Sequence, residues 1–139
     1  MLIPKKVKFR KWQTGRRNVA RRTPDTRGIT LAFGSFGLKA TTSARVKSNQ
    51  IESARKVATR TITKAGRIWI RIFPDRPFTA KPAEVGMGKG KGDPQGYCME
   101  VNPGRIIFEV DGIPEQLARE ALRKAGTKLP LKTRIVARQ

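Results

Sequence analysis

Apolar residues recur with helical spacing in two stretches of the chain. The first, residues 48–65, carries these residues on one face: Ile51, Ala54, Ala58, Ile62 and Ala65. Ser48 suits the N-cap, and Gly66 stands where helices often end in a left-handed residue. A second helix is predicted from Pro114, at its first position, to Gly126. Its apolar face contains Leu117, Ala118, Ala121, Leu122 and Ala125. The pattern therefore predicts two amphipathic helices.

Elsewhere apolar and polar residues alternate, as expected for strands. The alternation starts at Ile29 and continues past a bulge or bend predicted at Gly34–Gly37. Ile68–Phe73 alternates as well, and Pro74–Pro77 is expected to end that strand. Further strands are predicted at Lys81–Val85, Tyr97–Val101, Arg105–Val110 and 131–137. The order β-α-β-β-β-β-α-β predicts an α+β domain, with a mostly antiparallel sheet and two helices packed on one side.

Two glycine-containing segments interrupt this pattern. Asn102-Pro103-Gly104-Arg105 has the residues of a type II turn, so the flanking strands are expected to form a hairpin. Gly86–Gly92 contains four glycines in seven residues, which excludes a helix or strand there on entropic grounds. It also lacks the Ser or Thr and the following helix of a P-loop, since Asp93-Pro94 comes next. We expect a flexible, glycine-rich loop whose Lys89 and Lys91 can approach phosphates.

The net charge of the chain indicates a nucleic-acid-binding protein. The 139 residues include 31 Lys and Arg against 10 Asp and Glu, a formal net charge of +21. Residues 1–28 show no regular period and carry only one acid, Asp25. They are predicted to form a basic extended N-terminal arm, and residues 29–139 a single α+β domain. A surplus of this size requires a polyanion, and nucleic acid is the expected partner.

The composition also excludes several classes of site. The chain has no histidine and one cysteine, so the usual zinc sites, Ser-His-Asp triads and Cys-His dyads cannot form. Cys98 is interpreted as a small core residue, and Glu109 with Asp111 as a salt-bridged strand end. No apolar run is long enough to cross a bilayer. We expect no enzyme activity, cofactor, metal, membrane or small-molecule substrate, and a cytoplasmic location.

Several exposed side chains are candidates for contact with RNA. On the first helix, Lys56, Arg60 and Lys64 are spaced four residues apart opposite the apolar face. Phe9 and Trp12 are interleaved with the cations of the arm. They can stack on bases or, alternatively, Trp12 can dock onto the domain.

Five segments together resemble one protein family. They are residues 1–6, 33–40, 67–77, 87–92 and 103–115. In this order, and over essentially the whole chain, they resemble the bacterial large-subunit ribosomal proteins of the L-sixteen family. The resemblance implies a structural, RNA-binding constituent of the large subunit, located near the peptidyl-transferase centre. Its partners would be large-subunit rRNA, A-site tRNA and also P-site tRNA, and neighbouring ribosomal proteins.

The resemblance also assigns residues. The loop Met87–Gly92 resembles the segment that reaches toward the catalytic RNA, and the position before it, commonly arginine in the family, is Gly86 here. The expected RNA-binding residues are Lys5, Lys6, Lys8, Arg10, Lys11, Trp12, Arg16, Arg17, Arg55, Lys56, Arg60, Lys64, Met87, Lys89 and Lys91. The alternative function is that of a free-standing nucleic-acid chaperone or nucleoid-type binding protein.

Overall fold

A computed structural model describes residues 1–13 and 22–139 of the chain. Within them the structure contains two helices and seven strands, joined by turns and by irregular segments. The elements are β1 (Phe36–Ala40), β2 (Ala44–Lys47), α1 (Ser48–Ile62), β3 (Arg67–Ile70), β4 (Arg76–Ala80), β5 (Asp93–Val101), β6 (Ile106–Asp111), α2 (Glu115–Gly126) and β7 (Thr133–Ala137). This confirms the predicted α+β class.

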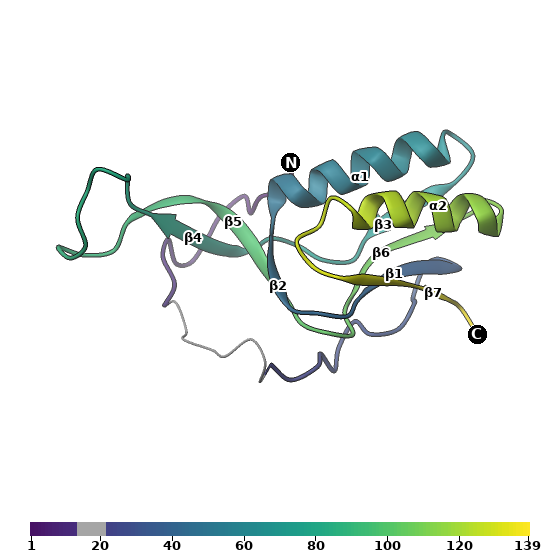
Figure 1. Cartoon of the computed structure of the whole chain (residues 1–139), viewed down its shortest axis with the longest axis horizontal. Coiled ribbons are helices and arrows are strands. Elements are labelled where there is room, and N and C mark those ends of the chain that lie inside the picture. The colour runs from purple at the N-terminus through teal and green to yellow at the C-terminus, as the bar shows by residue number, and fades with distance from the viewer. Residues whose placement is uncertain (14–21) are drawn as a thin grey trace.

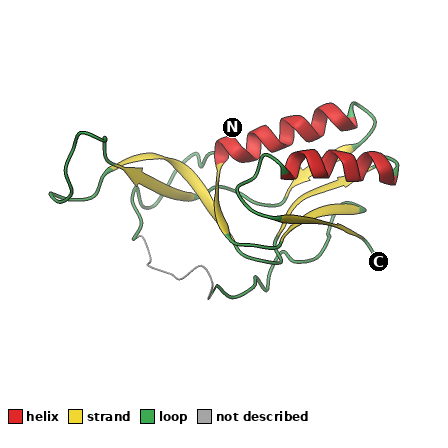
Figure 2. Ribbon diagram, viewed as in Figure 1, coloured by secondary structure: helices red, strands yellow, loops and turns green. Residues whose placement is uncertain are grey.

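The strands form two separate antiparallel sheets. The first has the order β3-β6-β1-β7, and both helices lie on one side of it (Figure 2). The second has the order β2-β5-β4. Its strands β4 and β5 extend away from the helices and carry the loop of residues 81–92 at their end (Figure 1). We call the first sheet with its helices the body, and β4, β5 and their loop the projection.

The core lies between the body sheet and the helices. Phe108 and Leu38 from the sheet, and Ile51 and Leu122 from the helices, are almost completely buried. Complete burial of one such side chain contributes about 1.5–3 kcal/mol to folding. Both helices present alanines to this core, which lets them pack closely on each other and on the sheet.

The helix predictions are confirmed with shifted ends. Lys47, not Ser48, is the N-cap of α1, and its N–H donates to Oε1 of Gln50 at 2.9 Å. The helix ends at Ile62 because Thr63 already adopts a positive φ of 62°. Gly66 therefore does not cap the helix, and Ala65 and Lys64 fall outside it. In α2, Pro114 is the N-cap and not the first helical residue, while Gly126 ends the helix as predicted.

Two strand predictions are wrong. Residues 29–33 form no strand, because their amides turn toward a buried carboxylate described below, and β1 begins only at Phe36. Lys81–Val85 forms a turn, and the strand lies earlier, at Arg76–Ala80. Pro77 lies within β4, which is possible because β4 is an edge strand, where a missing N–H is tolerated. Short β2 was not predicted.

The turn at residues 102–105 is confirmed, but the hairpin is not. Gly104 has a φ of +96°, and the N–H of Arg105 donates to the carbonyl of Asn102 at 3.3 Å. However, β5 pairs with β2 and β4, whereas β6 pairs with β1 and β3. The N–H of Gly104 donates instead to the carbonyl of Ala40 at 2.8 Å. The turn thus passes the chain from one sheet to the other.

Candidate nucleic-acid interface

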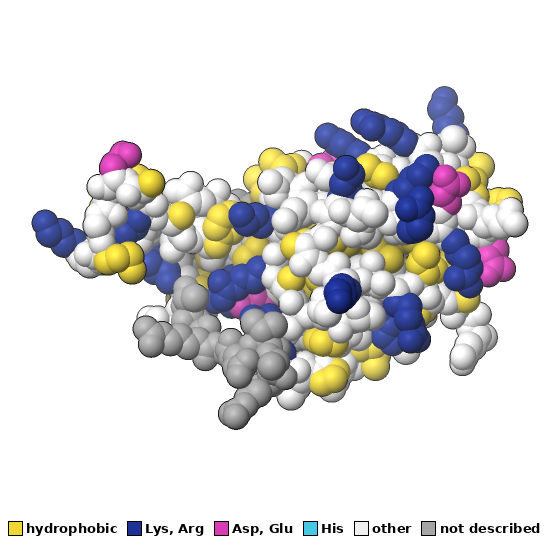
Figure 3. Space-filling view, in the orientation of Figure 1, with side chains coloured by type: hydrophobic (Ala, Val, Ile, Leu, Met, Phe, Trp, Pro, Cys, Tyr) yellow, Lys and Arg dark blue, Asp and Glu magenta, His cyan; other side chains and the backbone are white. Residues whose placement is uncertain are grey.

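The exposed face of α1 carries cations with few compensating acids. Lys56 and Arg60 are exposed there, and no ion pair joins them to any carboxylate of the described residues. Arg55 is half-buried and paired with Glu52, whose pKa that hydrogen bond lowers. Lys64 is exposed in the turn after the helix. Dark blue side chains gather along this outer surface of α1 in Figure 3.

The exposed face of α2 has a different arrangement of charge. Arg119 pairs with Glu115 at 2.9 Å, and Lys124 pairs with Glu120 at 2.8 Å, both one turn apart. The hydrogen bond from Lys124 lowers the pKa of Glu120. Exposed pairs of this kind contribute little to stability, but they neutralise the surface locally. Within the described chain, α1 therefore carries two exposed cations without an ion pair, Lys56 and Arg60, whereas α2 carries one, Arg123.

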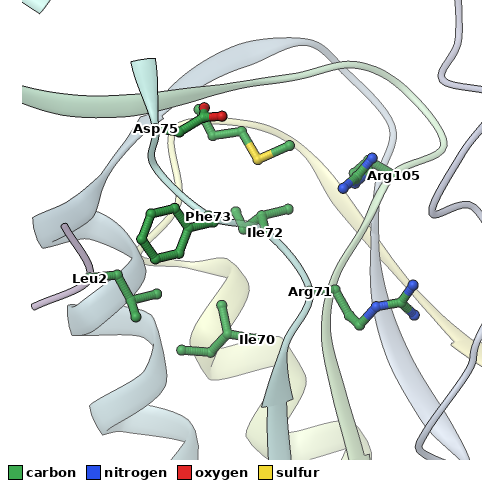
Figure 4. A pocket seen from close by; sticks show the side chains of 8 residues that line it. Leu2, Ile70, Arg71, Ile72, Phe73, Asp75 and Arg105 are labelled. Carbon is green, nitrogen blue, oxygen red and sulfur yellow. The ribbon is translucent and has the colours of Figure 1, made fainter. Parts of the chain in front are cut away.

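The first residues of the chain lie against the domain. Lys5, Lys6, Lys8, Arg10 and Lys11 are all exposed, whereas Leu2 packs against the core. Arg16 and Arg17 lie outside the described residues. Leu2 also lines a pocket of the body whose other side chains are Ile70, Arg71, Ile72, Phe73, Asp75, Met99 and Arg105. Leu2, Ile70 and Phe73 lie at one end of this pocket, and the two arginines at the other (Figure 4).

Trp12 contacts the projection through Arg76. The guanidinium of Arg76 lies 5.7 Å from the centroid of the indole ring, and its Nη2 donates to the carbonyl of Gln13 at 3.0 Å. Arg76 is fixed on its other side by Glu100, which also accepts from Arg45 at 3.2 Å. The indole keeps 41% of its surface exposed. Of the two alternatives for Trp12, the structure has the docked one, with part of the ring still open.

A second contact holds the chain after the undescribed residues 14–21. The N–H of Asp25 donates to the carbonyl of Pro103 at 3.0 Å, and Nδ2 of Asn102 donates to the carboxylate of Asp25 at 3.0 Å. The N–H of Ile106 donates to the carbonyl of Gly28 at 2.8 Å. The described parts of the basic arm are therefore held against the domain on both sides.

The glycine-rich loop is exposed over residues 82–91. Met87 at its tip is 98% exposed, and Lys89 and Lys91 are exposed as well. Gly88, Lys89 and Gly90 all have positive φ, of 100°, 58° and 100°. Glycine adopts this conformation without strain, which explains the spacing of the glycines around Lys89.

Hydrogen bonds connect this loop to its own stem and to the arm. Nζ of Lys81 donates to the carbonyl of Gly88, and Nζ of Lys11 donates to the carbonyl of Lys91 at 3.4 Å. The second of these bonds brings Lys11 of the arm beside the loop, although the two are distant in the sequence.

Glu109 occupies the centre of the body sheet and is completely buried. Its carboxylate accepts the N–H groups of Ala32 at 2.9 Å, Phe33 at 2.6 Å and Gly34 at 2.8 Å, and it pairs with Arg71. Burial alone raises the pKa of Glu109, but the three amides and the guanidinium outweigh it and hold the pKa below its usual value. This confirms the predicted ion pair.

Asp111 and Cys98 also have structural roles. The carboxylate of Asp111 accepts from Oγ of Ser35 and from the N–H of Gly112, each at 2.8 Å, and these bonds lower its pKa. Asp111 thus closes a turn by hydrogen bonds and forms no salt bridge with any described residue. Cys98 is buried in β5, as expected for a core residue, and burial raises the pKa of its thiol.

Sequence reasoning missed two contacts that the structure reveals. The first is the role of Arg76 as the partner of Trp12. The second is a stacked pair of rings, Phe33 and Trp69, with centroids 6.0 Å apart and an interplanar angle of 19°. The alternation of apolar residues with Trp69 and Arg71 was a signal for the second, because residues two apart in an extended segment point the same way.

Comparison with known proteins identifies relatives over the whole chain. The family model described as Ribosomal protein L16p/L10e matches residues 4–136. The large ribosomal subunit protein uL16 of Acidovorax sp. (strain JS42) is 53% identical over 139 residues, covering 100% of this chain and 98% of the relative. That of Verminephrobacter eiseniae (strain EF01-2) is 53% identical over 138 residues, covering 99% and 97%. No helix of the described residues is long and apolar enough to span a membrane.

Proposed function

Because this chain belongs to the ribosomal protein L16p/L10e family, and is therefore a structural constituent of the large ribosomal subunit and not an enzyme, we propose that its basic surfaces hold large-subunit rRNA and help to position A-site tRNA. As part of the ribosome it acts in the cytoplasm, with rRNA and other ribosomal proteins as partners. The residues proposed to contact RNA are Lys5, Lys6, Lys8, Arg10, Lys11, Trp12, Arg16, Arg17, Arg55, Lys56, Arg60, Lys64, Met87, Lys89 and Lys91.

The observation that carries this proposal is the contrast between the two helices. On α2 two cations follow acids at one-turn spacing and pair with them, which leaves Arg123 as its one exposed cation without an ion pair in the described chain. On α1 the exposed Lys56 and Arg60 repel each other unless a negative partner lies alongside. Phosphates of rRNA or of the A-site tRNA that lie along α1 remove this repulsion. Arg55 contributes less, since Glu52 already neutralises it.

The projection is suited to a confined site in RNA. Its loop is narrow, consists largely of glycine and carries exposed cations, so its backbone can approach phosphates closely. The contact of Lys11 with Lys91 brings the basic arm to the same place. In our proposal the projection reaches toward the peptidyl-transferase centre, and the P-site tRNA is a further partner there.

Reconstituted large subunits test this proposal. A Lys56→Ala/Arg60→Ala variant is expected to lower the affinity for A-site tRNA. The slope of log affinity for rRNA against log salt concentration should also decrease, by roughly one for each lost phosphate contact. The matched control is Arg123→Ala/Lys128→Ala, which removes two exposed cations from α2 and the turn after it. Equal effects of the two double variants would contradict a specific role for α1.

Sucrose-gradient sedimentation separates this function from the alternative of a free-standing nucleic-acid chaperone. A large-subunit constituent stays with the large subunit, in stoichiometric amount, after a wash at high salt. A chaperone or nucleoid-type protein instead sediments free of it.

A further inference from the structure

The body sheet has a second face, which the helices do not cover. Strand pairing places Trp69, Glu109, Gly37 and Val136 side by side across β3, β6, β1 and β7. Their neighbours along the strands, such as Leu38 and Phe108, point toward the helices. This row therefore runs across the helix-free face, which the segment leading into β1 crosses (Figure 2).

That segment is held tightly in place. A side chain at Gly37 would meet Cδ2 of Leu31 at 2.3 Å, so Leu31 packs directly on the backbone of β1. A side chain at Gly34 would meet the carbonyl oxygen of Val110 at 2.6 Å. Together with the amides that bind Glu109, these contacts fix residues 31–34 on the sheet. A buried carboxylate thus determines where the side chain of Phe33 stands.

Phe33 is nevertheless not buried. Its ring is stacked on Trp69, yet 55% of the residue remains exposed, and the guanidinium of Arg71 lies 5.4 Å from the ring centroid. Ile29 nearby is 37% exposed. A rigid, exposed aromatic ring beside a cation is the arrangement with which proteins stack unpaired bases.

The charge around the rings favours RNA over a protein partner. Strand pairing places the cations Lys39, Arg67 and Arg134 on this face. Arg71, just after β3, reaches it through its ion pair with Glu109. The carboxylates on it are Glu109, which is buried and satisfied, and Asp111, which is bonded to Ser35 and Gly112. Arg67 and Arg134 are exposed and form no ion pair within the described chain.

We propose that the helix-free face of the body is a further RNA-binding site, at which an unpaired base of RNA stacks on Phe33 while Arg67 lies near its phosphates. The site does not depend on the roles proposed for the cations of the arm, of α1 and of the projection. Glu109 acts as a positioning residue, because it holds the backbone of Phe33 without touching the RNA.

Binding to short RNA strands tests the site. The probes are an oligoadenylate and an abasic strand with the same number of phosphates, at one salt concentration. We expect Phe33→Leu to weaken oligoadenylate binding by about 5- to 150-fold and to leave abasic binding unchanged, since only a base can stack. Phe73→Leu is the matched control, because Phe73 is 44% exposed and lies at the opposite end of its pocket from Arg71 (Figure 4).

Trp12 is the competing stacking residue, so Trp12→Leu is compared in the same assay. The proposal would be overturned if Phe33→Leu still preferred the oligoadenylate to the abasic strand while Trp12→Leu lost this preference. A Trp12→Phe protein, with Trp69 as its one tryptophan, gives a second measurement. Oligoadenylate should quench its fluorescence and the abasic strand should not. Equal quenching by both strands would also contradict the site.

Crosslinking in assembled large subunits distinguishes RNA from protein as the occupant. A photoreactive side chain, introduced as Phe33→benzoylphenylalanine, is expected to crosslink to rRNA. A crosslink to a ribosomal protein alone would overturn the proposal and assign this face to a protein neighbour.

Discussion

Glu109 in the body is completely buried, whereas Met87 at the end of the projection is 98% exposed. The carboxylate of Glu109 is surrounded by three amides and a guanidinium, so its environment is formed by the protein itself. The loop around Met87 has open space at Gly86, Gly88 and Gly90, where an added side chain would meet nothing. The interior of the body is thus complete without a partner, while the loop of the projection presents exposed side chains that a partner can contact. Changes in the interior of the body should alter stability, and changes to the exposed cations of the loop should alter RNA binding.

The largest expected effect follows from removing the carboxylate at the centre of the body. Glu109→Ala leaves the charge of Arg71 and three backbone amides without their acceptor, and should lower the free energy of unfolding by about 3–5 kcal/mol. Urea denaturation measures this. The control, Glu115→Ala, breaks an exposed pair and should cost less than about 1 kcal/mol. Similar losses in the two variants would contradict the role of Glu109 in holding the loop before β1.

A smaller effect is expected in the pH dependence of the body. The folded pKa of Glu109 lies below its unfolded value of about 4.3, so its contribution to stability is complete above that pH and is lost as the pH falls through the folded pKa. Glu109→Gln should therefore flatten the acid limb of a plot of unfolding free energy against pH. Glu52, Asp111 and Glu120, whose pKa values are also lowered, should maintain part of that limb. An unchanged acid limb would mean that Glu109 is not ionised in the fold.

In the projection we expect the reverse pattern. Lys89→Ala should leave the free energy of unfolding within about 0.5 kcal/mol of the starting protein, because its side chain is exposed. The slope of log affinity for rRNA against log salt concentration should decrease by roughly one, the value for one lost phosphate contact. Parallel chemical denaturation and filter-binding assays at several salt concentrations measure both quantities. Loss of stability without loss of RNA affinity would reverse the comparison.

The smallest effect is expected from adding a cation to the projection. Gly86 has open space around it and no positive φ, so Gly86→Arg should be accommodated without strain. It should strengthen rRNA binding slightly at low salt and leave thermal unfolding unchanged. Gly88→Arg is the comparison, because its φ of +100° strains any side chain. An equal gain in rRNA affinity from Gly86→Arg and Gly88→Arg would indicate that only the net charge of the loop affects binding.

The part of the fold that could be predicted from the sequence depends on local periodicity. The spacing of Ile51, Ala54 and Ala58 gives α1, because a helix must bury one face. The Pro103-Gly104 turn was predictable for the same local reason, a required positive φ. What failed was pairing between distant strands. The sequence of β5 and β6 reads as a hairpin, and only the packing of the whole domain assigns them to two sheets.

Part of the candidate site could likewise be predicted from the sequence and part could not. The cations of α1 and of the loop were visible as charge without neighbouring acid, although Arg55 is taken by Glu52. The Phe33–Trp69 pair could not be predicted from the sequence, because the alternation of residues 29–33 is typical of a strand. The competing influence is Glu109, 76 residues away from Phe33, which draws those amides out of a sheet geometry.

The charge balance, helical period and glycine content of the chain are enough to predict a polyanionic partner, two amphipathic helices and no regular element at residues 86–92, because each is a local property. The remaining features come from the folded molecule: β5 and β6 lie in different sheets, the arm meets the projection at Lys11 and Lys91, and a buried carboxylate presents Phe33 on the helix-free face. These depend on contacts between residues far apart in the sequence, where burial and hydrogen bonding outweigh local preference.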